Sequence, residues 1–329
     1  MNIKTKNIFM ETNESIEIFS RKINELRQQI ANVIVGQQQT VDLILTAMLA
    51  DGHVLIEGVP GVAKTLLAKL VSKLVDARFS RIQFTPDLMP SDVLGTTVFN
   101  MKTSEFNFHH GPVFADMILV DEINRAPAKT QAALFEVMEE RQATIDGKTH
   151  PMGELYTIIA TQNPVEQEGT YRLPEAQLDR FIFKISMGYP TAEEEVDILK
   201  RHLANRELTR LETIQPTITV SELLEMRAML KDVFIEESLL RYITEIIQQT
   251  RTSRAVFLGA SPRASVAILN TSKAYAILSG RNFVAPDDIK TVAPAVLRHR
   301  LLLTAEAEME GYTPDKVAER LIDKVEVPK

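Results

Sequence analysis

Cysteine is absent from this chain of 329 residues. Its absence excludes disulfide bonds, thiolate metal ligands and a cysteine nucleophile, so any metal must be held by oxygen or histidine ligands. The chain also lacks a run of roughly 20 apolar residues that could cross a bilayer. Residues 1–15 include two lysines, but neither a sustained apolar core nor a small-residue cleavage site. We therefore expect a cytoplasmic protein that is not inserted in a membrane.

An excess of positive charge is missing as well, since the formal net charge is −7. This balance disfavours nucleic acid as a partner, although an assembled ring could line its pore with a few basic residues. The chain does have the composition of a soluble globular protein, with 45% hydrophobic and 25% charged residues. Its length favours two domains.

Short apolar runs alternate with helical patterns up to about residue 190. An amphipathic helix is expected first, over residues 13–34, with Asn13 as its cap. Later helical patterns cover residues 65–77 and 130–143. The apolar runs expected to form buried strands are residues 53–57, 77–84, 116–122, 155–163 and 181–187. Residues 1–190 are therefore predicted to form a three-layer α/β domain with a mainly parallel sheet.

Residues 191–329 have a different hydrophobic pattern, in which helical segments follow one another without strand-like runs between them. We predict an all-α lid domain here. Thr191, Ser221, Ser261 and Thr313 are candidate N-caps, and prolines 262 and 314 fall where the first helical turn tolerates proline.

Residues 53–65, HVLIEGVPGVAKT, run from a strand through a glycine-rich turn into a helix. The turn exposes backbone N–H groups and the helix adds the positive end of its dipole, so a triphosphate is attracted there. Lys64 is expected to reach the β and γ phosphates of ATP, and the Thr65 hydroxyl to bind Mg²⁺. Ala63 stands where the usual spacing has glycine, and it fits if its backbone is helical. The nucleotide-binding residues expected in this segment are Gly58, Val59, Pro60, Gly61, Val62, Ala63, Lys64, Thr65 and Leu66.

Two carboxylates, Asp121 and Glu122, follow the apolar run 117–120. The carboxyl end of a strand is where an open α/β sheet places its ligand. Asp121 is expected to hold Mg²⁺ through water, and Glu122 to act as the base for the attacking water. Taken alone, the pair could be a strand end turning into solvent, but the upstream phosphate-binding turn favours the catalytic interpretation.

These segments together resemble the MoxR group of the AAA+ ATPases. The resemblance rests on residues 58–65, 83–92, 121–126, 160–164 and 173–181, in this order and spacing. It implies that Asn163 is the sensor 1 residue that contacts the attacking water or γ phosphate. It also implies that Arg180, with Arg172 in reserve, is the arginine inserted by a neighbouring subunit, and that Arg263 is sensor 2. Gly36 and Gln37 match the segment that contacts adenine.

Two insertions support this subclass. The helix-2 insert, about residues 88–113, is expected to contain a hairpin with its turn near 101–105. A pre-sensor hairpin is expected at about residues 141–152, because Asp146-Gly147 stands between short strand-like runs. The resemblance implies that both hairpins face a pore or substrate.

Two further clusters of histidine and arginine are interpreted without a functional role. His109-His110 lacks spaced partners for a metal site and is expected in a plain loop. Residues 298–300, Arg-His-Arg, are expected on a solvated or subunit-facing helix edge.

The resemblance implies a ring of six subunits that couples ATP hydrolysis to chaperone-like remodelling, maturation or metal-cofactor insertion of a partner.

 The implied partner is a protein with a von Willebrand factor A domain. One alternative is a ring-forming nucleic-acid motor of the helix-2-insert class, which the acidic balance disfavours. Others are a P-loop binding protein or a small-molecule kinase, neither of which needs Arg180 and Arg263. A GTPase would carry an Asn-Lys-x-Asp motif, which the sequence lacks.

Overall fold

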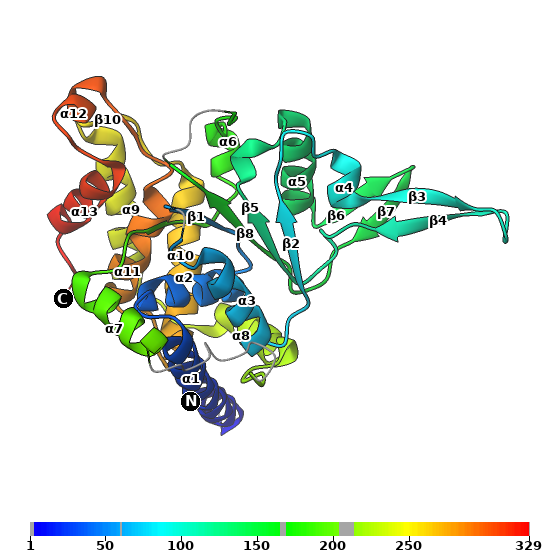
Figure 1. Ribbon diagram of the computed structural model, residues 1–329. Coiled ribbons are helices and arrows are strands. Elements are labelled where there is room, and N and C mark those ends of the chain that lie inside the picture. Colours follow the sequence, from blue (N-terminus) through cyan, green and yellow to red (C-terminus); the bar gives the residue numbers. More distant parts are fainter. Residues whose placement is uncertain (1–2, 60, 165–168, 204–213, 329) are drawn as a thin grey trace.

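The structure is a computed structural model that describes residues 3–59, 61–164, 169–203 and 214–328, with side chains from residue 15 onward. Its centre is a five-stranded parallel sheet in the order β2-β5-β8-β1-β9 (Figure 1). The expected strands are all present: β1 (Val54–Gly58), β2 (Phe79–Gln83), β5 (Met117–Asp121), β8 (Thr157–Gln162) and β9 (Phe183–Met187). The predicted fold class is confirmed.

Both faces of the sheet are covered, because side chains along each strand alternate between two cores. Val54 and Ile56 belong to one hydrophobic cluster, and Leu55 between them belongs to the other. The first cluster contains residues of α1, α2 and α3 and of several later helices, and the second contains residues of α4 and α5. The helices of this part of the chain are α1 (Ile3–Val33), α2 (Gln38–Leu49), α3 (Lys64–Leu74), α4 (Pro90–Leu94), η1 (Ile123–Arg125), α5 (Ala128–Glu140) and α6 (Glu175–Leu178).

After β9 the chain is mostly helical. The helices among its described residues are α7 (Ala192–Leu203), α8 (Val220–Met229), η3 (Leu230–Asp232), α9 (Glu237–Thr252), α10 (Pro262–Leu278), α11 (Pro286–Leu297), α12 (Ala305–Met309) and α13 (Pro314–Lys324). A short antiparallel pair, β10 (Val256–Leu258) and β11 (Leu302–Leu303), was not expected from the sequence. The cluster that covers one face of the sheet continues through α1 and α2 into these helices. The domain boundary at residue 190 therefore stays a prediction.

Both expected hairpins are present. Strands β3 (Gly95–Asn100) and β4 (Glu105–His110) form the first, which projects from the body of the molecule in Figure 1. Strands β6 (Gln142–Ile145) and β7 (Lys148–Pro151) form the second. Its turn places Asp146 at φ 50° and Gly147 at φ 74°, the positive angles that favour an Asp-Gly pair. The hairpins meet through rings: the centroids of Phe108 and His150 lie 4.3 Å apart.

Several local expectations need correction. Asn13 does not cap the first helix, which begins ten residues earlier at Ile3. Thr219, not Ser221, caps α8, because the Thr219 hydroxyl accepts a hydrogen bond from the N–H of Glu222. Thr191 and Thr313 do accept such bonds, and Ser261 occupies the N-cap of α10 without a side-chain bond.

The histidine pair 109–110 and the cluster 298–300 also differ from expectation. His109 and His110 lie in strand β4, not in a plain loop. His299 is buried and Arg300 is 6% exposed, so residues 298–300 are no solvated helix edge. Arg300 instead joins the helical part to the sheet, because its guanidinium pairs with Asp179 at 2.6 Å. Among the described helices, none is both long and apolar enough to cross a membrane.

Candidate active site

The ends of three neighbouring strands bring the predicted residues together. In the sheet, β8 lies between β5 and β1, and all three run parallel. Gly58 ends β1, Asp121 ends β5, and Asn163 directly follows β8. Since parallel strands end at the same edge, these residues share the carboxyl edge of the sheet. Asn163 is 9% exposed there.

The turn after β1 has an unusual backbone. Gly61 has φ 87°, and Ala63 has φ 62° and ψ 24°. The expectation of a helical backbone at Ala63 is therefore wrong: this residue is left-handed, and α3 begins only at Lys64. Left-handed backbone costs an alanine roughly 1–2 kcal/mol, which explains why glycine is usual at this position. Pro60 lies outside the described residues.

Lys64 and Thr65 lie in the first turn of α3. The Lys64 ammonium donates to the carbonyl oxygen of Gly58 at 2.6 Å. The Thr65 hydroxyl donates to Oδ2 of Asp121 at 3.4 Å, so the two expected Mg²⁺ ligands are neighbours. Hydroxyl and carboxylate oxygens are hard donors that suit Mg²⁺, which takes its remaining ligands from water and phosphate. The described residues contain no group of three acidic or histidine side chains that would form a complete metal cage.

Arg81 is a member of this site that the sequence did not reveal. Its Nε donates to Oδ2 of Asp121 at 2.7 Å, while Thr161 donates to the other oxygen at 3.1 Å. Arg81 lies on β2, whose pairing with β5 places Gln83 opposite Asp121. The only signal in the sequence is a basic residue two places before the end of an edge strand. Such a residue is identified only once strand register is known.

Glu122 has a strained position beside this carboxylate. Its backbone is left-handed, with φ 56° and ψ 50°, and its N–H donates to the Thr161 hydroxyl at 3.0 Å. Its side chain is 38% exposed and pairs with Arg125 at 2.9 Å. Left-handed backbone in a residue other than glycine is concentrated at functional sites, where the surroundings hold it in place. The Glu122 carboxylate is therefore within reach of solvent.

The two predicted arginines lie elsewhere. Residues 179–182 precede β9, and Ile182 bonds to His53 just before β1, so this segment is at the amino edge of the sheet. A cavity there is lined by residues that include Gly52, Arg180 and Arg263. Arg180 pairs with Glu139, and Arg263, 74% exposed, lies 3.5 Å from Asp179. Strands of five residues separate the two edges by about 16 Å.

The structure therefore does not bring Arg180 or Arg263 to the Lys64 of its own chain. For Arg180 this agrees with the expectation of a role in a neighbouring subunit. Arg263, the expected sensor 2 residue, also lies away from the phosphate-binding turn of its own chain. Arg172 is exposed next to Tyr171, whose N–H bonds to the carbonyl of Asn124 near the carboxyl edge.

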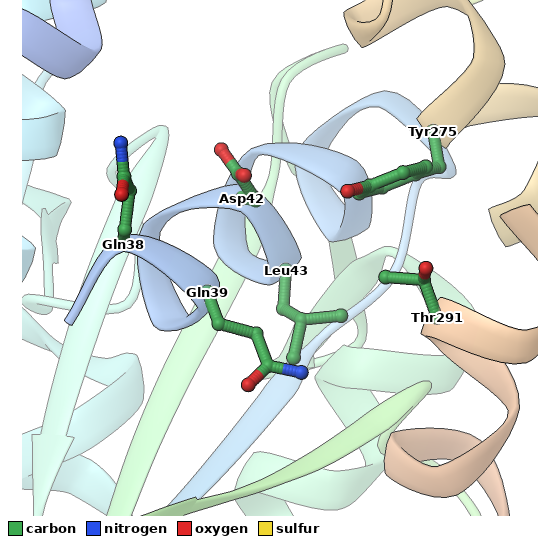
Figure 2. Close-up of a pocket in the computed structure, with 6 residues that line it drawn as sticks. All are labelled: Gln38, Gln39, Asp42, Leu43, Tyr275 and Thr291. Carbon is green, nitrogen blue, oxygen red and sulfur yellow. The ribbon is translucent and has the colours of Figure 1, made fainter. Parts of the chain in front are cut away.

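Gly36 and Gln37 form the turn between α1 and α2, and both have positive φ, 70° and 63°. Arg27 of α1 and Asp42 of α2 pair across this turn at 2.6 Å. Burial raises the pKa of Asp42, and the nearby Arg27 charge opposes that rise. Figure 2 shows Asp42 at a pocket between α2 and two later helices, with Tyr275 and Thr291 on the far side. This pocket does not include the residues after β1.

Comparison with known proteins adds to these structural observations. Residues 53–183 match the profile of the ATPase family associated with various cellular activities (AAA), and residues 248–321 match that of the AAA lid domain. The chain is 45% identical to the uncharacterized protein YeaC of Bacillus subtilis, over 92% of this chain and 93% of YeaC. It is 43% identical to Chaperone MoxR1 of Mycobacterium tuberculosis, over 92% of this chain and 81% of that one.

A solved structure is similar over almost the whole chain. It is the crystal structure of a protein from Cytophaga hutchinsonii that is provisionally described as an ATPase. The two folds superimpose with a TM-score of 0.88 at 40% sequence identity, over 98% of this chain and 99% of that one.

Proposed function

Because the chain belongs to the MoxR family of AAA+ ATPases, we propose that it hydrolyses ATP at sites shared by neighbouring subunits of a ring. ATP hydrolysis itself follows from the family. The observation that carries the shared site is the separation of its parts. Lys64, Thr65 and Asp121 lie at the carboxyl edge of the sheet, whereas Arg180 and Arg263 lie at the amino edge.

Within one subunit, the carboxyl edge supplies the groups that hold phosphate and activate water. Lys64 and the backbone N–H groups of the turn bind the phosphates. Thr65 and Asp121 hold Mg²⁺, which when bound neutralises phosphate charge. Glu122 accepts a proton from the attacking water, and Asn163 orients that water. Before it can accept the proton, the Glu122 carboxylate must release Arg125, with which it pairs at 2.9 Å.

The neighbouring subunit supplies positive charge to the same phosphates. An arginine brought from outside is worth roughly 10³ to 10⁵ in rate in phosphoryl-transfer enzymes. Arg180 and Arg263 both line one cavity at the amino edge, so a contact between the amino edge of one subunit and the carboxyl edge of the next delivers both. Such a head-to-tail contact builds rings when its rotation closes, and we propose a hexamer.

Mixing of inactive variants tests this arrangement. Lys64→Ala removes the phosphate site, and Arg180→Ala removes the donated arginine, so each variant alone should lose hydrolysis. In rings that assemble at random from a 1:1 mixture of the two variants, about a quarter of the contacts between subunits join an intact Lys64 to an intact Arg180. Activity should return to about that fraction. A mixture as inactive as its parts would contradict a site shared between subunits.

A second mixing experiment tests which subunit supplies Arg263 to the site. If Arg180 and Arg263 are donated together, no contact in a mixture of Arg180→Ala and Arg263→Ala subunits has both, and the mixture should stay inactive. If Arg263 served the site of its own chain, about a quarter of contacts would be complete and activity would return. Recovery in this second mixture would therefore disprove donation of Arg263 by the neighbour.

The energy of hydrolysis is proposed to remodel or mature a partner protein, including insertion of a metal cofactor. Support comes from the relative described as a chaperone, and we propose as partners proteins with a von Willebrand factor A domain. Glu122→Gln should bind ATP, hydrolyse it slowly and retain such partners, which mass spectrometry of the captured complex would identify. Capture of DNA alone, with ATPase stimulation by DNA, would instead indicate a nucleic-acid motor.

A further inference from the structure

The turn that contains Gly36 is covered by helix α7, and the proposed chemistry does not use this contact. Near the end of α7, Arg201 donates to the carbonyl oxygens of Ala31 and Asn32, at 2.8 and 3.2 Å. At its start, the Glu194 carboxylate lies over Gly36: a methyl group on Gly36 would be 2.5 Å from Oε1. Two contacts, one at each end, therefore fix α7 along the turn between α1 and α2.

The orientation of the Glu194 carboxylate is also fixed. Its Oε2 accepts hydrogen bonds from the N–H and the hydroxyl of Thr191, at 2.8 and 3.1 Å. In return, the Thr191 hydroxyl accepts the N–H of Glu194, which completes a capping box. This leaves Oε1 as the oxygen nearest Gly36. Glu194 is half-buried, whereas its neighbours Glu193 and Glu195 are exposed.

The carboxylate lies on the same side of the sheet as the phosphate-binding turn. Met187, the last residue of β9, is paired with Gly58, the last residue of β1. Only residues 188–191 separate β9 from α7. The five steps from Met187 to Ala192 span at most about 18 Å when fully extended, so α7 begins near the carboxyl edge.

We infer that Glu194 makes the site selective for adenine over guanine, with Oε1 accepting a hydrogen bond from the exocyclic amino group of adenine. This rests on the proposed function, together with the resemblance, which implies that the adenine base lies at Gly36 and Gln37. Guanine carries a carbonyl oxygen where adenine carries the amino group. A carboxylate facing that carbonyl leaves two acceptors without a donor, which disfavours guanine.

Equilibrium titration with ADP and GDP, each with Mg²⁺, tests this role. The wild-type protein should bind ADP at least ten-fold more tightly than GDP, which is roughly the value of one hydrogen bond to a charged group. Glu194→Gln keeps an oxygen for the cap of α7 and offers an amide donor to guanine. Its preference for ADP should fall roughly ten-fold. Glu193→Gln, a matched change on the exposed neighbour, should keep the wild-type preference.

The outcomes separate this inference from the proposed function. A wild-type protein without preference, or a Glu194→Gln variant whose preference stays within about two-fold of wild type, would overturn the role of Glu194 and leave the ATPase intact. A wild-type protein that binds neither nucleotide would contradict the proposed site itself. So would a Lys64→Ala variant that binds both as tightly as wild type, and in either case the inference on Glu194 falls too.

Discussion

At the scale of single residues, the phosphate-binding turn depends on the left-handed backbone of Ala63, at φ 62°. Ala63→Gly removes the strain but adds flexibility to the unfolded chain, and these effects oppose each other. We expect a change in unfolding free energy below about 1 kcal/mol, with ADP affinity retained. Ala63→Val introduces a β-branched residue that is far less tolerant of this backbone. It should cost about 2 kcal/mol and weaken ADP binding.

Chemical denaturation and ADP titration of both variants would check this. Equal behaviour of the glycine and valine variants would show that the left-handed backbone at residue 63 has no energetic role.

The residues found from the sequence are those that can be identified by their neighbours along the chain. Lys64 and Thr65 begin the helix after one strand, Asp121 and Glu122 stand at the end of another, and the structure places them together. Arg81 was missed because its contact with Asp121 depends on the pairing of two strands that are far apart in sequence. The backbone of Ala63 was predicted wrongly because alanine is a strong helix former, and the sequence does not show that the helix begins only after it.

At the scale of elements, the two hairpins are joined by aromatic rings. Phe108 and His110 of β4 lie 4.3 and 5.9 Å from His150 of β7, measured between ring centroids. The chain then continues from β7 into β8, which ends next to Asn163. The hairpins are thus packed together at one end and connected to the active site at the other.

His150→Ala should loosen this joint. An aromatic contact is worth about 1 kcal/mol beyond its area, so amide exchange in β3 and β4 should become roughly five-fold faster. His109→Ala, which changes an exposed histidine of β4, is the control and should leave exchange unchanged. Hydrogen exchange read by mass spectrometry gives the result for both. Equal exchange in the two variants would show that the rings do not hold the hairpins together.

Arg300 joins the helical part of the chain to the sheet. Besides its pair with Asp179, it donates to the carbonyl oxygens of Phe181 and Val296, at 2.9 and 2.6 Å. Arg300→Met removes these bonds and the close partner of the Asp179 carboxylate, and should lower the unfolding free energy by about 3 kcal/mol. Arg241 pairs with Glu237 in full exposure, so Arg241→Met should cost less than about 0.5 kcal/mol. Urea denaturation measures both, and similar losses would refute the structural role of Arg300.

The strands and most helices could be predicted because each has its own hydrophobic period. The direction in which the helical part packs could not. That direction depends on contacts such as Arg300 with Asp179 and α10 with α2, which join distant segments. For this reason Arg263 could be assigned to a helix start from the sequence, but its edge of the sheet could not be predicted.

At the scale of the whole molecule, two buried histidines make stability depend on pH. Burial lowers the pKa of His53 to about 3, aided by the charge of Arg141. Burial, with Arg300 nearby, also lowers the pKa of His299. Both values lie below the unfolded value of about 6.5, so between these limits the unfolded chain binds more protons. The stability is complete above pH 6.5 and is lost as the pH falls, by up to about 1.4 kcal/mol per pH unit for each histidine.

His53→Gln retains a donor and an acceptor for Met138 and Ile158 but has no proton to gain. The pH dependence of its unfolding free energy between pH 6.5 and 4 should be shallower than in wild type, by up to one proton. The same change at the exposed His202 is the control. A slope that stays at the wild-type value in His53→Gln would refute the assignment.

Assembly should also control activity. Because Lys64 and Arg180 lie at opposite edges of the sheet, an isolated subunit has no complete site. Hydrolysis per subunit should therefore rise, by roughly 10³ or more, as concentration passes the assembly transition. Steady-state rates measured alongside sedimentation would show this. A rate per subunit that is the same below and above the transition would exclude the shared site.

The opposite placement of the two halves has a consequence for how sites are counted. In an open row of subunits, the first has an unused amino edge and the last an unused carboxyl edge, so the row has one site fewer than it has subunits. Adding the subunit that closes the row joins both free ends at once and creates two sites. Closure is thus a larger catalytic step than any earlier addition, and a gap at one contact silences a single site while the others keep working.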